Sequence, residues 1–205
     1  NKKSMIEKLV NPYYLNKAPA LKNSFKKEPF SHHFLTNFFI KPKIDAIRKA
    51  IEKEHFEEKN TDLFHIYQTK DLNNAKNKEI KNFVRCLSSP KFKKFISNIT
   101  SIRVTGKIDI SSLKLEKTNY LLCHDDQLTK RKIAFIIYLS TLKKSDGGSL
   151  SFFNTKNNKP KEIVKAFSPQ YNTLMVFEVS KKSFHQIDEV ITNKERLTIG
   201  GWFHD

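Results

Sequence analysis

Three side chains in the second half of the sequence have the types and the spacing of a metal-ligand set. His124 and Asp126 form an H-x-D pair, His185 follows 61 positions after His124, and Arg196 stands eleven residues further on. Two imidazoles and one carboxylate can occupy one face of an octahedral metal ion and leave the opposite face open, which is typical of a non-haem Fe(II) centre. A nearby arginine would then hold the carboxylate of an acidic cosubstrate.

Taken alone, each of these residues has a simpler explanation. An H-x-D pair in a chain with seven histidines can be a hydrogen bond in a turn, His185 can be bonded within a sheet, and Arg196 can lie at the surface near a strand end. The context favours a site. An apolar run, YLLC, leads into His124, and a spacing of two on an extended chain puts His124 and Asp126 on one face. Asp125 then points the other way, as a turn residue, a residue behind the ligands or a solvated acid.

Two more strand-like segments would bring the remaining residues to the same place. In SFHQI, Phe184 can enter the core while His185 faces the opposite side. In RLTIGGW, period two puts Arg196 and Thr198 on one face, and a guanidinium with a hydroxyl beside it makes a carboxylate clamp. Tyr138, in the run RKIAFIIYLS, can donate a hydrogen bond to the same carboxylate, unless its hydroxyl lies at the domain edge.

The elements that must position these residues change in type near residue 101. Helical spacing predicts helices over 41–57, 76–88 and 91–99, and the segment 1–30, broken by three prolines, is expected to be an extended arm with one short helix. Short β-branched and aromatic runs predict strands at about 101–109, 118–124, 131–140, 148–154, 162–167, 173–179, 183–187 and 196–203. We therefore expect a mainly β fold with N-terminal helices packed on one outer face, with supporting helices in 1–100 and a sandwich or jelly roll in 101–205.

The composition indicates a globular protein and limits its possible partners and location. With 38% hydrophobic residues and 17 Phe in 205 residues, the chain can bury a sizeable core. The net charge of +17 favours contact with RNA or another polyanion, but the basic residues are mostly Lys and Asn is abundant, which is also the signature of a compositional bias. Cys86 and Cys123 make no disulfide framework, and Cys123 is expected in the core. No run is long enough to cross a membrane, and we predict a cytoplasmic protein.

The order of these blocks resembles the 2-oxoglutarate- and Fe(II)-dependent oxygenases. YLLCHDD, FIIYLS, DGGSLSFF, PQYNTLMVF, SFHQIDEV and RLTIGGWFH are similar to successive blocks of the prolyl hydroxylases that modify a small-subunit ribosomal protein. The resemblance covers about residues 101–204 and reaches back more weakly over 26–57.

The resemblance implies a double-stranded β-helix with Fe(II) held by His124, Asp126 and His185. It implies that Arg196, helped by Thr198 and Tyr138, binds 2-oxoglutarate, with dioxygen as cosubstrate and ascorbate as a candidate reductant. The expected partner is a protein substrate, with a ribosomal protein as the first candidate, approaching over the metal between the strand 149–154 and the loop 155–162. Relatives commonly carry a second, non-catalytic jelly roll, and a single catalytic domain is expected here. They also tend to have a Tyr nine residues before the first ligand, where this chain has Leu115, so the hydrogen bonding of substrate or cosubstrate is open to question.

Three other functions fit part of the pattern. The same chemistry can act on an amino acid, another protein or a nucleobase, because substrate contacts lie in loops. An inert jelly roll could bind RNA or ribosomes, which the charge favours and the intact ligand set disfavours. A cupin-like isomerase with another divalent metal would not need Arg196 and Thr198 together on the last strand.

Overall fold

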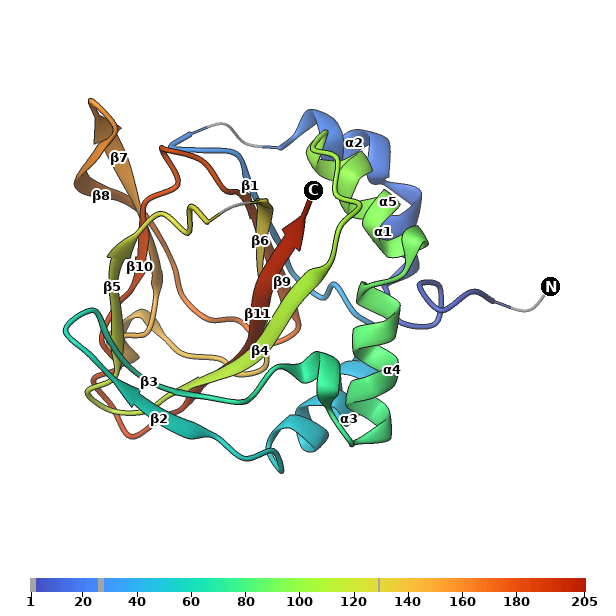
Figure 1. Cartoon of the computed structure of the whole chain (residues 1–205), viewed down its shortest axis with the longest axis horizontal. Helices are drawn as coiled ribbons and strands as arrows, with labels where there is room; N and C mark the ends of the chain where they lie inside the picture. The colour runs from blue at the N-terminus through green and yellow to red at the C-terminus, as the bar shows by residue number, and fades with distance from the viewer. Residues whose placement is uncertain (1–2, 26–27, 129) are drawn as a thin grey trace.

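An antiparallel β-sheet that curls back on itself forms the centre of the molecule (Figure 1). The computed structural model describes residues 3–25, 28–128 and 130–205. Within those ranges the strands are β1 (His32–Leu35), β2 (Glu57–Asn60), β3 (Phe64–Gln68), β4 (Ile108–Leu115), β5 (Tyr120–His124), β6 (Arg131–Tyr138), β7 (Leu150–Lys156), β8 (Lys159–Phe167), β9 (Thr173–Glu178), β10 (His185–Ile187) and β11 (Arg196–His204).

Two halves of this sheet face each other across an interior. One half has the order β1-β9-β6-β11-β4 and the other β5-β10-β7-β8, while β3 joins them by pairing with both β4 and β5. From β4 to β11 the chain crosses repeatedly from one half to the other, which is the strand arrangement of a jelly roll. The predicted fold class, a jelly roll with N-terminal helices, is confirmed.

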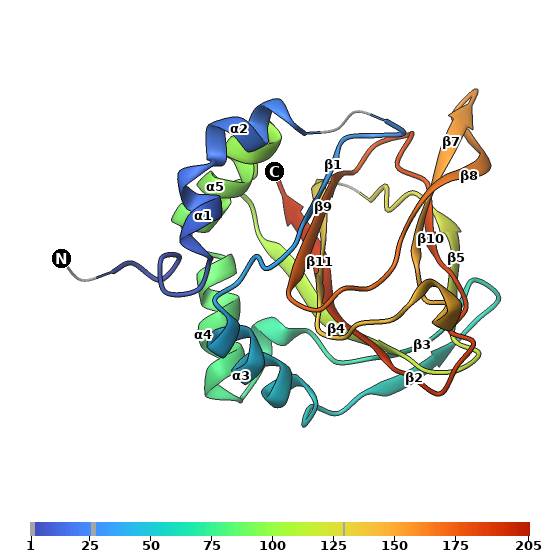
Figure 2. The same ribbon diagram turned by 180° about the vertical axis from the view of Figure 1, so that it is seen from behind.

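The helices cover the outer face of one half only (Figure 2). They are α1 (Pro12–Asn16), α2 (Ala18–Asn23), α3 (Lys41–Ile51), α4 (Lys78–Leu87) and α5 (Pro90–Thr100). Two short 3₁₀ turns lie in connections, η1 (Leu72–Asn74) before α4 and η2 (Lys144–Asp146) before β7. Their apolar faces pack on outward-facing side chains of β6, β9 and β11, such as Ile133, Phe135 and Ile137. The prediction that the helices pack on one outer face is therefore correct.

A second core fills the space between the two halves. It contains Leu115, Tyr138, Leu150, Phe152 and Met175, each fully buried. Strand β6 contributes to both cores because its alternate residues point to opposite faces. This two-sided burial explains why its sequence is nearly continuously apolar rather than alternating.

Three strands occur in the part of the chain that was predicted to be helical. β1 pairs with β9, so a segment from the first hundred residues extends the same sheet. β2 and β3 form a hairpin, and the helix predicted over 41–57 ends at Ile51 because the chain must turn into β2. The strand predicted at 101–109 is wrong: it begins at Ile108, after Ser101 has closed α5 in a left-handed conformation.

Two further segments differ from the expectation. The predicted loop 155–162 is the end of a β-hairpin, β7–β8, which turns at Asn157 and Asn158, both with positive φ. The predicted N-terminal arm holds two short helices instead of one, and it is anchored because Val10 is fully buried and bridges to Phe39. No helix in the described ranges is long and apolar enough to span a membrane.

Candidate metal and cosubstrate site

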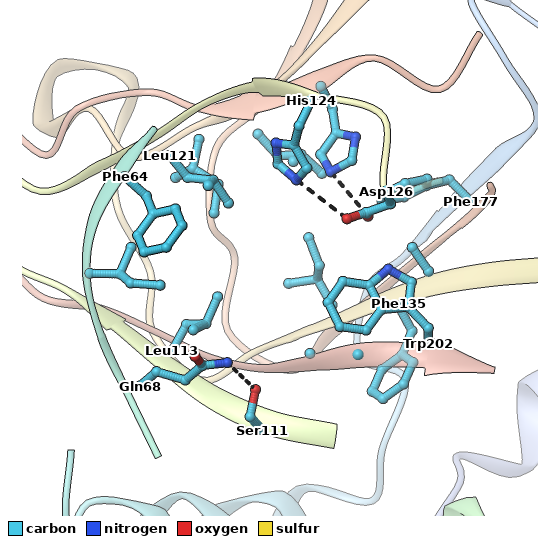
Figure 3. Close-up of a pocket in the computed structure, with 18 of the residues that line it drawn as sticks. Phe64, Gln68, Ser111, Leu113, Leu121, His124, Asp126, Phe135, Phe177 and Trp202 are labelled. Carbon is cyan, nitrogen blue, oxygen red and sulfur yellow. Dashed lines mark hydrogen bonds and ion pairs between the residues drawn. The ribbon is translucent and has the colours of Figure 1, made fainter. Parts of the chain in front are cut away.

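His124, Asp126 and His185 meet at one mouth of the interior (Figure 3). His124 ends β5, His185 begins β10, and the two stand directly opposite each other in the antiparallel register. One ligand atom from each of the three residues can be chosen so that all lie within 4.8 Å of one another. The structure therefore brings together the three residues that the sequence singled out, from segments 61 positions apart.

Backbone carbonyls fix the orientation of both imidazoles. His124 Nδ1 lies 2.8 Å from the Leu122 carbonyl, and His185 Nδ1 lies 2.7 Å from the Ser183 carbonyl. A carbonyl can only accept, so each Nδ1 carries a proton and each Nε2 is the ring nitrogen that faces the candidate metal position. Both Nε2 atoms point toward the Asp126 carboxylate, at 3.4 Å from its two oxygens.

Asp126 reaches this position by a turn, not by continuing the strand. Its φ is +61°, in the left-handed region that Asp adopts more readily than most residues. The expected common face of an extended chain is therefore not what aligns it with His124. Burial would raise the pKa of the Asp126 carboxyl, but the two neighbouring imidazoles outweigh burial and hold that pKa well below its usual range. In the same way, burial opposes charging of His124, yet the Asp126 carboxylate raises its pKa.

Ser183 ties the two ligand-bearing loops together. Its hydroxyl lies 3.0 Å from the Asp125 carbonyl and 2.8 Å from the Ser180 carbonyl. Asp125 itself accepts hydrogen bonds from the backbone and side chain of Gln127, so its carboxylate acts as a turn residue. Sequence reasoning missed Ser183, although its place two residues before a candidate ligand was a usable signal.

Around the mouth lies a mostly apolar cavity of about 360 Å³. Its walls include Phe64 and Leu121 on one side and Trp202 on the other, with the carboxylate and the imidazoles above (Figure 3). Arg131 stacks on the Trp202 ring, with its guanidinium carbon 3.3 Å from the ring centroid, and lies 4.0 Å from Asp126. Phe64 comes from β3 and was missed with that strand, although the alternation in FHIYQ could have predicted it.

Two expectations about this region are corrected. Cys123 is half-buried and lines the cavity, whereas it was expected in the core; both it and Cys86 are free thiols. Phe184 is half-buried, and the inward face of its segment carries Ser183, His185 and Ile187. The register in β10 places His185 inward because it pairs with Phe152 of the interior core.

Arg196 lies on β11, deeper in the molecule, and is fully buried. Its Nε donates to the Gly148 carbonyl at 2.9 Å, its Nη1 lies 3.5 Å from the Thr198 hydroxyl, and its Nη2 has no partner. No carboxylate in the described ranges forms an ion pair with it. A buried, unpaired cation costs several kcal/mol, and burial lowers the Arg196 pKa accordingly.

Two hydroxyls in the strands near Arg196 also lack hydrogen-bond partners. Tyr138, whose ring centroid lies 5.3 Å from the guanidinium carbon, has a buried hydroxyl without a partner, and so has Thr173. Tyr138 stands between Thr173 of β9 and Thr198 of β11 in the strand register, so the three hydroxyls form one row. Thr173 was missed by sequence reasoning; the signal was a lone hydroxyl at the start of a buried strand.

Leu115 stands opposite Arg196 in the register of β4 and β11 and is fully buried. No hydroxyl is available from this position, as the sequence indicated. The apolar side chain leaves Tyr138, Thr173 and Thr198 as the neighbours that can complement an anion held by the guanidinium.

The donor set fits a divalent transition metal, and the buried row fits a carboxylate. Two neutral imidazole nitrogens and one carboxylate suit Fe(II). At the other end, unpaired donors on Arg196, Tyr138 and Thr173 match the acceptor oxygens of an anion, which would remove the cost of leaving them unpaired.

Comparison with known proteins agrees with these observations. Residues 110–204 match the family model of the 2OG-Fe(II) oxygenase superfamily. Over 86% of its length the chain is 39% identical to the prolyl 3-hydroxylase OGFOD1 of Xenopus laevis, and equally to that of Mus musculus. The chain spans about a third of the length of these curated relatives, 35% and 33%.

Solved structures support the fold. A prolyl-4-hydroxylase of Pseudomonas putida superposes with a TM-score of 0.73, covering 92% of this chain and 98% of its own, at 13% identity. A prolyl hydroxylase of Trichoplax adhaerens, solved with a peptide of the hypoxia inducible factor, gives 0.67, covering 95% and 94%, at 14% identity. At such identity the likeness establishes the fold alone.

Proposed function

Since the chain carries a 2OG-Fe(II) oxygenase domain and so belongs to that superfamily, we propose that it hydroxylates a prolyl residue of a protein substrate and releases succinate and CO2. The observation that carries this proposal is the pairing of two sites in one interior. A set of three metal donors stands at the mouth, and an unpaired arginine with hydroxyls stands at the buried end.

The proposal gives each residue a role. His124, Asp126 and His185 hold Fe(II), and Arg196, Thr198 and Tyr138 hold the far carboxylate of 2-oxoglutarate, with Thr173 as an additional donor. Bound iron supplies the redox chemistry that couples decarboxylation of 2-oxoglutarate to hydroxylation. The protein's own residues orient both groups, and the apolar cavity walls exclude water from the reacting atoms.

A protein substrate is supported by the relatives, which are named as prolyl hydroxylases. The cavity is lined mostly by apolar side chains and includes the three candidate metal donors, as a site for a pyrrolidine ring requires. Within this proposal a ribosomal protein is the first candidate substrate. The predicted cytoplasmic location and ascorbate as reductant stay predictions.

A second candidate is the same chemistry on another substrate. An inert binding module is disfavoured because all three donors are present and their ligand atoms lie within 4.8 Å of one another. A cupin-like isomerase is disfavoured because its reaction would not require the buried, unpaired Arg196.

The first test is anaerobic loading with Fe(II), followed by aerobic turnover of 2-oxoglutarate to succinate with and without prolyl peptides and ribosomes. Succinate formation that rises with a ribosomal prolyl target, together with a mass increase of one oxygen on that target, supports the proposal. Turnover without any peptide effect would leave the cofactor chemistry and reject the prolyl substrate. Absence of both iron binding and succinate would overturn the enzyme assignment.

A further inference from the structure

The outward faces of α4 and α5 carry rows of basic side chains. On α4, Lys78, Lys81 and Arg85 follow one another at helical spacing and are all exposed. On α5, which begins at Pro90 after the short Ser88–Ser89 link, Lys91 and Lys94 do the same. Residues three or four apart lie on the same side of a helix, so each helix presents a basic stripe opposite to its buried apolar face.

These charges are sorted along the chain and are not spread evenly. Residues 76–107 hold nine basic residues and one acidic residue, Glu79, whereas residues 52–62 hold five acidic and two basic residues. A general enrichment in Lys would raise the positive charge everywhere. Negative charge is thus concentrated around β2, and positive charge is concentrated both on α4 and α5 and, on the opposite flank, on the β7–β8 hairpin.

Few carboxylates offset the basic stripes. Within the described ranges, Lys78, Lys81, Arg85 and Lys94 form no ion pair within 4.0 Å. Glu79 lies in the first turn of α4, and Glu7 interacts electrostatically with Lys91. Like charges left without partners repel one another, and an anionic ligand would relieve that repulsion.

We propose that this helical face binds the phosphate backbone of nucleic acid, an interaction separate from the hydroxylation proposed for the jelly roll. Neither helix exposes a large apolar side chain, and helices that bind membrane surfaces need an exposed apolar face beside the basic one. Exposed Asn82 and Asn98 interleave with the basic residues and can donate to phosphate or base oxygens.

The location separates this surface from the metal site. The helices lie on one flank of the curled sheet and β5, β7 and β8 lie on the opposite flank (Figures 1 and 2). A nucleic acid held on α4 and α5 would leave the mouth above His124 open. The protein could therefore stay attached to an RNA-containing assembly while the cavity receives a peptide.

The test compares two triple variants with the same change in charge. Lys81→Glu/Arg85→Glu/Lys94→Glu alters the helical face, and Lys156→Glu/Lys159→Glu/Lys161→Glu alters exposed lysines of the β7–β8 hairpin. Binding of a short single-stranded RNA and of DNA of matching sequence is measured by fluorescence anisotropy over a salt series, with melting temperatures to verify folding. A neutral version, Lys81→Gln/Arg85→Gln/Lys94→Gln, guards against effects of the introduced carboxylates.

The helical variant is expected to lose at least tenfold in affinity for both nucleic acids. The slope of log affinity against log salt should fall by about 2, at about 0.7 per phosphate contact on a single strand. The hairpin variant should stay within about threefold of the original protein, as expected of charges outside the contact surface. Equal losses in both variants would mean that net charge alone drives binding, and would overturn the proposal. Absence of binding to either nucleic acid would also overturn the proposal. The same holds if vesicles with anionic lipid, tested in parallel, bind the protein and the nucleic acids do not.

Discussion

The two ends of the jelly-roll interior are built in opposite ways. At the mouth, the polar groups complete one another: Asp126 lies between two imidazoles, and both imidazoles are held by backbone carbonyls. At the deep end, Arg196, Tyr138 and Thr173 each keep a buried polar atom without a partner. The candidate metal donors at the mouth therefore contact one another before any ligand arrives, while the indole Nε1 of Trp202 in the cavity wall has no partner; at the deep end three neighbouring side chains have such atoms.

The two ends should therefore gain free energy from ligand binding in different ways. Metal at the mouth replaces contacts that already exist, so its ligands are preorganised but their mutual attraction must be exchanged for coordination. An anion at the deep end removes a standing cost, because unsatisfied buried donors are paired for the first time. Substitutions at the two ends should therefore have different effects on the protein without its ligands.

The largest effect is expected at the mouth. Asp126→Ala or His124→Ala removes a donor from the set of three, and turnover of 2-oxoglutarate should fall more than about 100-fold, beyond the loss that follows when only a supporting residue is removed. Iron binding, measured by anaerobic titration, should weaken in parallel. Full activity in either variant would remove these residues from the metal site.

Arg196→Met is expected to separate ligand binding from folding. Loss of a charge-assisted hydrogen bond should raise the KM for 2-oxoglutarate roughly 10- to 150-fold, from about 1.5–3 kcal/mol. The melting temperature without ligand should stay equal or rise, because a buried unpaired cation is replaced by an apolar chain of similar length. A clear fall in melting temperature with an unchanged KM would mean that Arg196 stabilises the free protein and does not bind the cosubstrate.

Ser183→Ala tests whether the mouth depends on the connection between its loops. The hydroxyl that bridges to the Asp125 and Ser180 carbonyls would be lost, and iron affinity should fall about tenfold, at the low end for a supporting residue. Ser24→Ala, at an exposed helix end, is the matched control and should change nothing at the metal. Equal affinities in the two variants would show that the loops hold their places without this bridge.

Sequence patterns predicted well the parts that depend on periodicity. The helices at 76–88 and 91–99 were found because one buried face imposes a period on the residues, and β6 and β9 were found as short apolar runs that are buried on both faces. β1, β2 and β3 were missed in the half of the chain that was predicted to be helical, and β2, which is exposed throughout, has no hydrophobic pattern to reveal it. A short strand of this kind is defined by its pairing with distant residues, which local spacing does not record.

The sequence indicated which residues make up the candidate site better than it indicated how the backbone places them. The three donors were found from residue type and order, but the positive φ of Asp126 depends on the turn that follows β5. Thr173 was not found, because a hydroxyl inside a buried strand becomes meaningful only when the register sets it beside Tyr138. Register is a property of the paired strands and cannot be read from one of them.

The smallest effect is expected from single hydroxyls at the deep end, and it gives the sharpest test of the contrast. Tyr138→Phe and Thr173→Val each remove a buried oxygen that has no partner while keeping the shape of the side chain. If these oxygens bind the cosubstrate, each variant should raise the KM for 2-oxoglutarate about fivefold, from about 1 kcal/mol per hydrogen bond. The melting temperature of the free protein should not fall, and the stabilisation produced by saturating 2-oxoglutarate should be smaller. Ser112→Ala is the control, since its hydroxyl already donates to the Thr198 carbonyl at 2.7 Å; that variant should lose stability with little change in KM. A drop in free-protein stability in Tyr138→Phe would mean that its hydroxyl is satisfied without a ligand, and the deep end would no longer differ from the mouth.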